Sequence, residues 1–203
     1  MIVRRVLMVG VLAMLAMPAR AADGPAQAIA QLNDGLLQVM KAGRTTPFDK
    51  RVAILSPIVA RVFDLPLLLQ NSVGPARWPS IPDAQKTQLM EVFGQFTVAS
   101  YVANFDQFNG ETFAIAADPR KVGKDVVVQT QLKGNGNENT RLDYVMSDAH
   151  GGWHVIDILL DGTISRVAVT RSDYRALLGQ GDATRLIESL RGKVASLSTG
   201  TPQ

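Results

Sequence analysis

The sequence predicts an α+β fold in which several helices pack on an antiparallel or mixed sheet of at least four strands. Two observations support this fold class. Apolar residues recur at three- and four-residue steps through the first half of the chain and again near its end, which is the period of amphipathic helices. Between Phe113 and Leu160 apolar residues instead alternate with other residues, which is the period of half-buried strands. Helices first, a sheet next and helices last are typical of α+β domains.

The first two predicted helices are amphipathic. One spans residues 25–40, and the other runs to about Phe63 after Thr46, an expected N-cap, and Pro47 at a favourable first position. Pro57 lies inside the second helix and predicts a kink or break there. The residues expected to be buried in these helices are Ile29, Leu32, Leu36, Val39, Phe48, Val52, Leu55, Val59 and Val62.

Two further helices precede the sheet. Asp64 is expected to cap a short apolar helical turn that contains residues 67–69 and ends near Gly74. The longest helix begins at residues 80–83 and is expected to stop near residues 109–110. Its buried stripe would contain Leu89, Phe93, Phe96, either Ser100 or Tyr101, and Phe105.

Glycine-rich turns connect the predicted strands. Residues 134–137 and 150–152 supply the positive φ angles that hairpins need, so adjacent strands should pair antiparallel. The fourth strand is apolar on both faces except for Asp157, which predicts a central position in the sheet. The expected strands lie at 113–115, 126–132, 142–146 and 153–160.

The helical period returns after the sheet. It runs from Ile164 through Leu178, and Asp182 is then expected to cap a last helix. The residues expected to be buried in this last helix are Leu186, Ile187, Leu190 and Val194.

The first 21 residues have the three parts of a secretory signal peptide. Arg4 and Arg5 precede an apolar run, and the run is followed by a small-residue cleavage site that ends at Ala21. The run is shorter than the roughly 20 residues that a membrane span needs, so cleavage should release the protein outside the cytoplasm. The expected organisation is a signal peptide over 1–21, a single domain over 22–198 and a flexible tail over 199–203.

Composition excludes several classes of protein. Arg4, Arg5 and Arg20 would leave with the signal peptide, and the remaining basic residues then equal the 18 acidic ones in number. A nearly neutral chain without a basic cluster is not expected to bind nucleic acid or to adhere to an anionic membrane surface. The chain has no cysteine, so neither disulfides nor a thioether-linked lipid can hold it.

The sequence offers little for catalysis. His150 and His154 flank a Gly-Gly turn and could supply metal ligands with Asp148 or Asp157, but ordinary surface positions are favoured, with His150 pointing into solvent. No nucleophile and base occur in a known motif. A buried carboxylate must find hydrogen-bond donors, so Asp157 is expected to bind backbone amides near a helix start. Neither a cofactor nor a metal site is predicted.

The apolar segment 67–69 has two interpretations. It packs into a common core, or it lines a pocket for an apolar ligand beside the sheet, since ligand cavities have mostly apolar walls. Periodicity does not separate the two.

Several motifs occur in a fixed order along the chain. The most specific is Gly152-Trp153-x3-Asp157-x3-Asp161-Gly162. The others are Phe63-Asp64, Gly74-x3-Trp78, residues 85–101 with Phe93, Phe96 and Tyr101, Phe108-Asn-Gly110-Glu111, and Gly181 ahead of Leu186-Ile187-x2-Leu190. In this order the motifs resemble the MlaC/toluene-tolerance family of periplasmic lipid-binding proteins, over nearly the whole mature chain.

The resemblance implies a soluble carrier and no enzyme. Members of the family take phospholipid between an inner-membrane ABC transporter with an MCE-domain ring and an outer-membrane lipoprotein–porin complex. The acyl chains would lie in an apolar cavity between sheet and helices, with the head group near solvent, and a monomer is expected. Large apolar residues on the inferred inward faces are the predicted cavity wall: Leu68, Val73, Phe96, Phe113, Val128, Tyr144, Trp153 and Val155.

Three alternatives remain open at this stage. Residues 163–174 look more like the hopanoid-associated HpnM branch of the family, which implies a hopanoid-like cargo. A periplasmic adaptor with a solid interior would carry no lipid. An enzyme acting on an envelope lipid would use Asp157 with a histidine.

Overall fold

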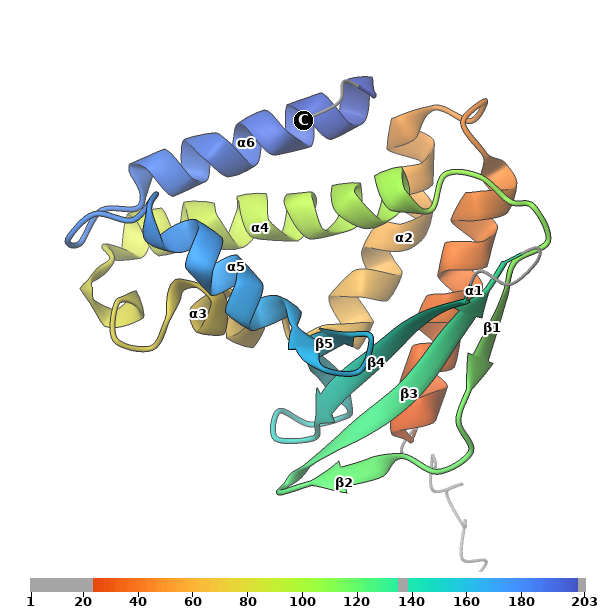
Figure 1. Ribbon diagram of the computed structural model, residues 1–203. Helices are drawn as coiled ribbons and strands as arrows, with labels where there is room; N and C mark the ends of the chain where they lie inside the picture. The colour runs from red at the N-terminus through yellow and green to blue at the C-terminus, as the bar shows by residue number, and fades with distance from the viewer. Residues whose placement is uncertain (1–23, 135–138, 201–203) are drawn as a thin grey trace, which may run out of the picture.

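The computed structural model describes residues 24–134 and 139–200 of the 203-residue chain. The expected signal peptide over 1–21 and most of the turn at 134–137 lie outside the described residues, as do residues 201–203 of the expected tail. The structure confirms the α+β class, with helices before and after an antiparallel sheet (Figure 1). The helices are α1 (Pro25–Ala42), α2 (Phe48–Val62), α3 (Leu65–Val73), α4 (Asp83–Asn104), α5 (Arg166–Arg175) and α6 (Thr184–Thr199), with a short 3-10 helix at Trp78–Ser80.

Helix α1 buries the predicted stripe against α2 and the sheet. Ile29, Leu32, Leu36 and Val39 have no exposed surface, which confirms the periodicity. The two helices approach closely at Gly35, where an added Cβ would lie 2.4 Å from Cδ1 of Ile58.

Helix α2 differs from the prediction in two respects. Its N-cap is Pro47 rather than Thr46, because the Thr46 hydroxyl donates instead to the carbonyl of Ala42 at the end of α1, at 2.8 Å. The helix also continues through Pro57 without a break. A proline inside a helix removes one backbone hydrogen bond, and the packing of Leu55 and Val59 in the core maintains the helix across that gap.

The ends of α3 and α4 show how polar residues set helix boundaries. Asp64 caps α3 as predicted, with its carboxylate accepting from the Leu67 N–H at 2.9 Å. Helix α4 ends at Asn104, five residues before the expected stop. Phe105 leaves the helix and stacks on Tyr101 at 6.0 Å between ring centroids, while Asp106 binds Arg44.

Among the described residues the sheet has six strands, all paired antiparallel, in the order β1-β3-β4-β5-β6 with β2 also beside β3. Gly151 and Gly152 have positive φ in the β4–β5 hairpin, as predicted. The fourth strand was expected to be central, but β5 lies one place from the end of this order, with the two-residue β6 and a bridge between Phe63 and Val155 on the side away from β4. The strands are β1 (Thr112–Ile115), β2 (Arg120–Val122), β3 (Asp125–Lys133), β4 (Asn139–Ser147), β5 (His154–Leu160) and β6 (Ile164–Ser165).

The β5–β6 turn and the start of α5 were not predicted in this form. Ile164, expected in a helix, belongs to β6, and α5 begins at Arg166. Asp161 and Gly162 both have positive φ in the connection 161–163, and the Thr163 N–H donates to the Leu160 carbonyl at 3.2 Å. This turn directs the chain from the sheet back into α5.

The last helix packs along α4 and buries Leu186, Ile187 and Leu190 as expected, whereas Val194 is only half-buried. Asp182 is not the N-cap itself, which is Ala183, but its carboxylate accepts from the Thr184 N–H at 3.0 Å. Hydrogen bonds to Thr184 and Gln85 hold the pKa of Asp182 below its ordinary value.

Figure 1 shows α4 and α6 running side by side above the sheet, with α3 and α5 together at one side and α1 and α2 at the other. No helix in residues 24–134 and 139–200 is long and apolar enough to cross a membrane.

Candidate functional site

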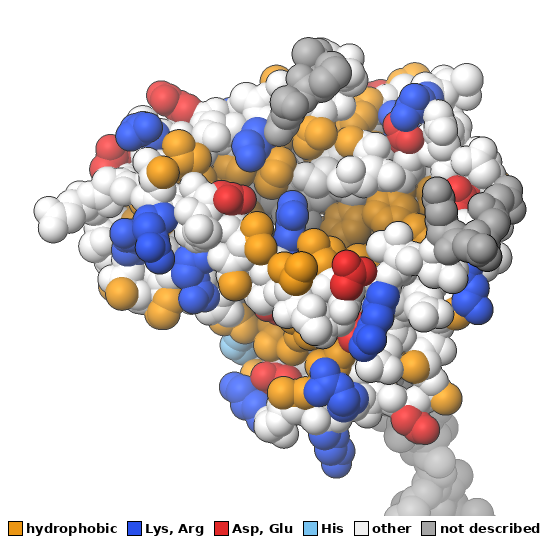
Figure 2. Space-filling view, viewed as in Figure 1, with side chains coloured by type: hydrophobic (Ala, Val, Ile, Leu, Met, Phe, Trp, Pro, Cys, Tyr) orange, Lys and Arg blue, Asp and Glu red, His pale blue; other side chains and the backbone are white. Residues whose placement is uncertain are grey.

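A cavity of about 610 Å³ lies between α4 and the inner face of the sheet. Helix α3 contributes Leu68 and Ser72, α5 contributes the residues from Arg166 to Tyr174 that face inward, and the sheet contributes Leu132, Leu142 and Leu160. Figure 2 shows the hollow with hydrophobic side chains inside it and charged side chains at its edge. Its size falls within the roughly 300–1,000 Å³ of typical ligand sites.

The residues of the sheet that line the cavity lie on one face by register. Leu142 pairs with Leu160 and Tyr144 pairs with Ile158, so alternate residues of β4 and β5 point toward α4. Asp157 alternates with Ile158 and pairs with Val145 in the same register; the register shifts only beyond this pair, where Met146 pairs with Val155. The Asp157 carboxylate accepts from Ser165 and Val167 at the start of α5.

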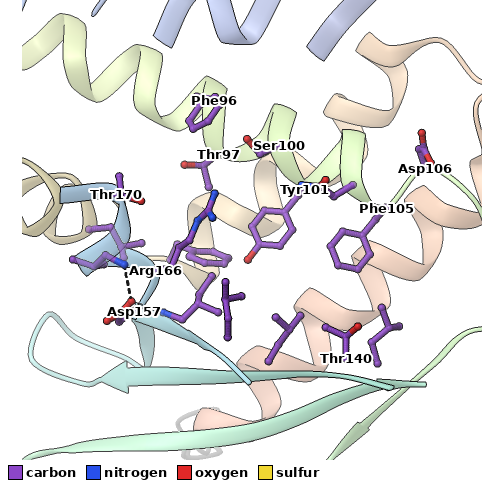
Figure 3. A pocket seen from close by; sticks show the side chains of 18 of the residues that line it. Phe96, Thr97, Ser100, Tyr101, Phe105, Asp106, Thr140, Asp157, Arg166 and Thr170 are labelled. Carbon is purple, nitrogen blue, oxygen red and sulfur yellow. Dashed lines mark hydrogen bonds between the residues drawn. The ribbon is translucent and has the colours of Figure 1, made fainter. Parts of the chain in front are cut away.

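Aromatic rings form a row along the side of the cavity next to α4, which we call the upper wall. The Tyr101 ring lies 5.8 Å from that of Phe63 and 6.0 Å from that of Phe105, and Phe105 lies 6.3 Å from Phe113. Ring pairs at these separations stabilise one another beyond their buried area. Phe63, Tyr101 and Phe105 of this row give the cavity a rigid apolar side. Figure 3 shows Tyr101 and Phe105 pointing into the cavity.

One face of α4 carries most of the upper wall. Phe93, Phe96, Thr97, Ser100, Tyr101 and Asn104 recur at three- and four-residue steps and all line the cavity. The predicted buried stripe of this helix contained Phe93 and Phe96 with Ser100 or Tyr101, and the structure brings both Ser100 and Tyr101 to the wall. This face mixes apolar rings with hydroxyl groups.

Asp157 performs the structural role that was expected of it. Its carboxylate accepts from the backbone N–H of Val167 at 3.0 Å, from the Ser165 hydroxyl at 2.5 Å and from its neighbour Ile158 at 2.7 Å. Ser165 is the N-cap of α5 and Val167 lies in its first turn. The carboxylate thus fixes the start of α5 at the cavity edge.

Arg166 follows the N-cap and points into the cavity beside Thr97 and Tyr101 (Figure 3). Burial raises the pKa of Tyr101 well above its ordinary value, and the nearby Arg166 charge opposes this only in part. Burial also raises the pKa of Tyr174, again against Arg166. Both phenols therefore stay neutral hydrogen-bonding groups at physiological pH.

Two of the eight predicted wall residues line the cavity. Leu68 and Phe96 belong to its wall, and the ring of Phe96 also lies 5.7 Å from the Lys193 amine. The other six lie outside the lining. Val73, Val128, Tyr144 and Val155 are buried in the core, and Phe113 and Trp153 are half-buried residues packed against it.

Sequence reasoning did not single out Arg166, Tyr174 or Leu142 as lining residues. Leu142 shares its sheet face with Tyr144, so alternation carried a signal for it. The sequence contained no signal that Arg166 and Tyr174 line the cavity. The start of α5 depends on the turn at Asp161-Gly162 and on Asp157, which lies in β5.

The histidines lie around a different hollow, with Asp64 at the start of α3. The His150 side chain is exposed, as expected, and its Nδ1 also lies 2.5 Å from the Asp64 carboxylate at the start of α3. His154 binds the carbonyl of Gly152 instead. Within the part of the chain that the structure describes, no three His, Cys, Asp or Glu side chains form a metal-binding group.

Comparisons with known proteins agree with this geometry. The family model described as "MlaC protein" matches residues 30–192. Among solved structures, the phospholipid-binding protein from Ralstonia solanacearum in complex with a phospholipid is similar with a TM-score of 0.74 and 21% sequence identity, over 87% of this chain and 99% of that one. No curated protein matches the chain.

Proposed function

The chain belongs to the MlaC protein family, and from this premise we propose that it binds a phospholipid in the cavity below α4 and carries it between membranes. The observation that carries the proposal is the cavity itself, which has an apolar interior and a polar edge. The Ralstonia solanacearum protein of the same fold was solved in complex with a phospholipid, which supports the same type of ligand here.

The chemistry of the wall suits acyl chains. Each methylene removed from water contributes about 0.8 kcal/mol, so two long chains gain tens of kcal/mol in gross transfer free energy from an apolar wall. In this proposal Leu68, Phe96 and Leu142 contact the acyl chains directly. The core residues Val73, Val128, Tyr144 and Val155 support the wall from behind, with Phe113 and Trp153 beside them.

Transport rather than catalysis fits the placement of the polar groups. Asp157 uses both carboxylate oxygens to hold the start of α5. The histidines line the second hollow, whereas Asp157 lines the cavity, and of the described residues lining the cavity Phe63 alone also lines the second hollow. An enzyme that combined Asp157 with a histidine would need these groups around one substrate. The proposed carrier requires only reversible binding.

The place of action in this proposal is the periplasm, reached through the signal peptide expected over 1–21. The partners are an inner-membrane MCE/ABC transporter complex and an outer-membrane lipoprotein–porin complex, with the protein acting as a monomer. Family membership supports both partners. The net direction of transport follows from the relative affinities of donor, carrier and acceptor.

A matched pair of charge substitutions tests lipid binding. Leu142→Glu places a carboxylate in the wall, whereas Val122→Glu makes the same change at a β2 residue that is 45% exposed. We expect Leu142→Glu to reduce extraction of phospholipid from vesicles at least about tenfold, because a charge among acyl chains is costly, and Val122→Glu to extract as the unmodified protein does.

Each protein is separated from the vesicles after incubation. The lipid that it has extracted is then identified and quantified by mass spectrometry, for the unmodified protein and for both variants. Circular dichroism confirms that both variants fold. A folded Leu142→Glu variant that extracts phospholipid normally would place the lipid elsewhere. A hopanoid-like lipid recovered in place of phospholipid from native membranes would support the HpnM alternative.

A further inference from the structure

Arg166 is the only basic residue among the described residues that line the cavity. It occupies the first position of α5, and its side chain is exposed. Figure 3 shows the side chain reaching toward α4, beside Thr97 and Tyr101. Within residues 24–134 and 139–200 it forms neither a hydrogen bond nor an ion pair.

The acidic residues of the lining already have donors. Asp106 binds Arg44 at 2.6 Å, and Glu111 accepts from the backbone N–H of Asn109 at 2.5 Å. Asp157 accepts from the three groups at the start of α5 described above. The guanidinium is therefore the one charge of the described lining that lacks a partner.

Two phenols, those of Tyr101 and Tyr174, line the same cavity as Arg166. Tyr174 is 4% exposed, and its hydroxyl has no hydrogen-bond partner within the described structure. The positive charge of Arg166 lowers the pKa of Tyr101 and of Tyr174, although burial raises both by more. A buried hydroxyl without a partner is costly, so an oxygen-rich ligand group there would be favourable.

The position of Arg166 in its helix points to an anion as well. The first turn of α5 contains no acidic residue, and a cation at a helix N-terminus is opposed by the helix dipole. An anion bound at the guanidinium would offset this cost. Guanidinium groups also fit phosphate oxygens in a bidentate geometry, and such charge-assisted bonds are stronger beside apolar surroundings.

We propose that Arg166 and Tyr174 bind the phosphodiester of the lipid cargo and give the protein its preference for phosphate-bearing over neutral lipids. This inference rests on the proposed function, since it assigns the head-group end of the same cavity. Arg166 supplies the charge, and the Tyr174 hydroxyl donates to a phosphate or glycerol oxygen.

A competition between two lipids with the same chains tests the assignment. The protein is incubated with vesicles of phosphatidylcholine that contain equal amounts of dioleoylphosphatidylglycerol and dioleoylglycerol, and the ratio of these two lipids in the separated protein is measured by mass spectrometry. The two lipids share their acyl chains, so their ratio reports the phosphate contact and is insensitive to a partial loss of folded protein.

We expect Arg166→Gln to lower the ratio of phosphatidylglycerol to dioleoylglycerol by about tenfold, the effect of losing a charge-assisted bond. Arg166→Lys keeps the charge without the bidentate geometry and should retain part of the preference. Tyr174→Phe should lower the ratio less than Arg166→Gln. Arg175→Gln, the same change at an exposed position of α5 outside the lining, should leave the ratio unchanged.

The outcomes separate this inference from the proposed function. If the unmodified protein takes up no lipid from the vesicles, phosphatidylcholine included, the carrier proposal fails. If it takes up both and Arg166→Gln leaves their ratio unchanged, the carrier stands and the phosphate assignment is overturned. Inorganic phosphate alone is titrated by calorimetry, and Arg166-dependent binding of phosphate by a protein that takes up no lipid would make this a free-phosphate site and also overturn the assignment.

Discussion

At the scale of single residues, Gly162 shows how a turn and a buried charge depend on one another. Asp143 has no exposed surface, and its carboxylate forms a bidentate pair with Arg141 at 2.7 and 2.9 Å. An added Cβ at Gly162 would lie 2.7 Å from that guanidinium, and its φ of 74° disfavours other residues. The Asp161-Gly162 pair of the family-like motif therefore preserves both the hairpin and the ion pair.

The three tyrosines predict how stability changes at alkaline pH. Burial raises the pKa of Tyr101, Tyr144 and Tyr174 above that of an unfolded tyrosine. The folded protein then keeps phenol protons that the unfolded chain loses, so this stability is fully present below about pH 10 and is lost above it. We expect the free energy of unfolding to fall by about 1.4 kcal/mol per pH unit for each tyrosine.

Urea unfolding between neutral and strongly alkaline pH measures this slope, with phenolate absorbance reporting ionisation. Tyr174→Phe provides the comparison and should make the slope shallower by one tyrosine. A free energy of unfolding that stays constant above pH 10 would show that the phenols ionise without unfolding.

Single-residue predictions from the sequence succeeded where local chemistry decides the outcome. Asp64 caps α3, and Asp157 binds the start of a helix, because carboxylates satisfy free backbone N–H groups wherever the chain presents them. Thr46 failed as a cap because the end of α1 offered its hydroxyl the carbonyl of Ala42. His150 found Asp64 across the fold, a contact without a signal in sequence spacing.

At the scale of elements, α5 depends on the sheet for its beginning. Its own sequence supplies the Ser165 cap, and β5 supplies the Asp157 carboxylate that accepts from the Val167 N–H. Because Arg166 and Tyr174 both line the cavity, the start of this helix determines where the proposed head-group contacts lie.

We therefore expect Asp157→Ala to loosen α5 selectively. Loss of an acceptor for a helix N-terminus costs about 1 kcal/mol, so amides in the first turn of α5 should exchange with deuterium faster, while those of α6 should remain protected. Hydrogen exchange followed by mass spectrometry makes the comparison. Asp173→Ala, a change at an exposed residue of the same helix, is the control.

Unchanged protection of the first turn in Asp157→Ala would contradict the role assigned to this carboxylate. A catalytic role would instead predict intact helix protection with lost turnover of a lipid substrate.

The elements themselves were largely predictable. Helices and strands with a clear apolar period were found, since the core selects one face of each. The short strands β2 and β6 are too brief to show a period. The position of β5 was misjudged because Ile156 and Leu159 are only half-buried near the sheet edge, where apolar character alone suggested a strand buried on both faces.

At the scale of the whole molecule, a cavity rather than a solid interior separates a carrier from an adaptor. The sequence pattern predicts which apolar residues lie on the inner faces. It does not predict which of these residues line the cavity below α4. Val128 and Leu142 lie on the same face of the sheet, yet Val128 is buried in the core and Leu142 lines the cavity. That difference arises from how the helices are spaced above the sheet, which no local pattern encodes.

The same spacing explains why the lining is chemically mixed. Apolar residues of the sheet and α3 face the hydroxyl groups of α4, and the cationic start of α5 lies at the edge. In the proposed carrier the acyl chains contact the apolar residues of the sheet and α3, and the head group lies at the start of α5.

The most direct test of the account is native mass spectrometry of the protein purified from periplasm without detergent. The account predicts a mass above that of the mature chain by one phospholipid, which fragmentation would identify. A chain without bound lipid in repeated preparations, with no uptake from phospholipid vesicles, would contradict the account and favour an adaptor.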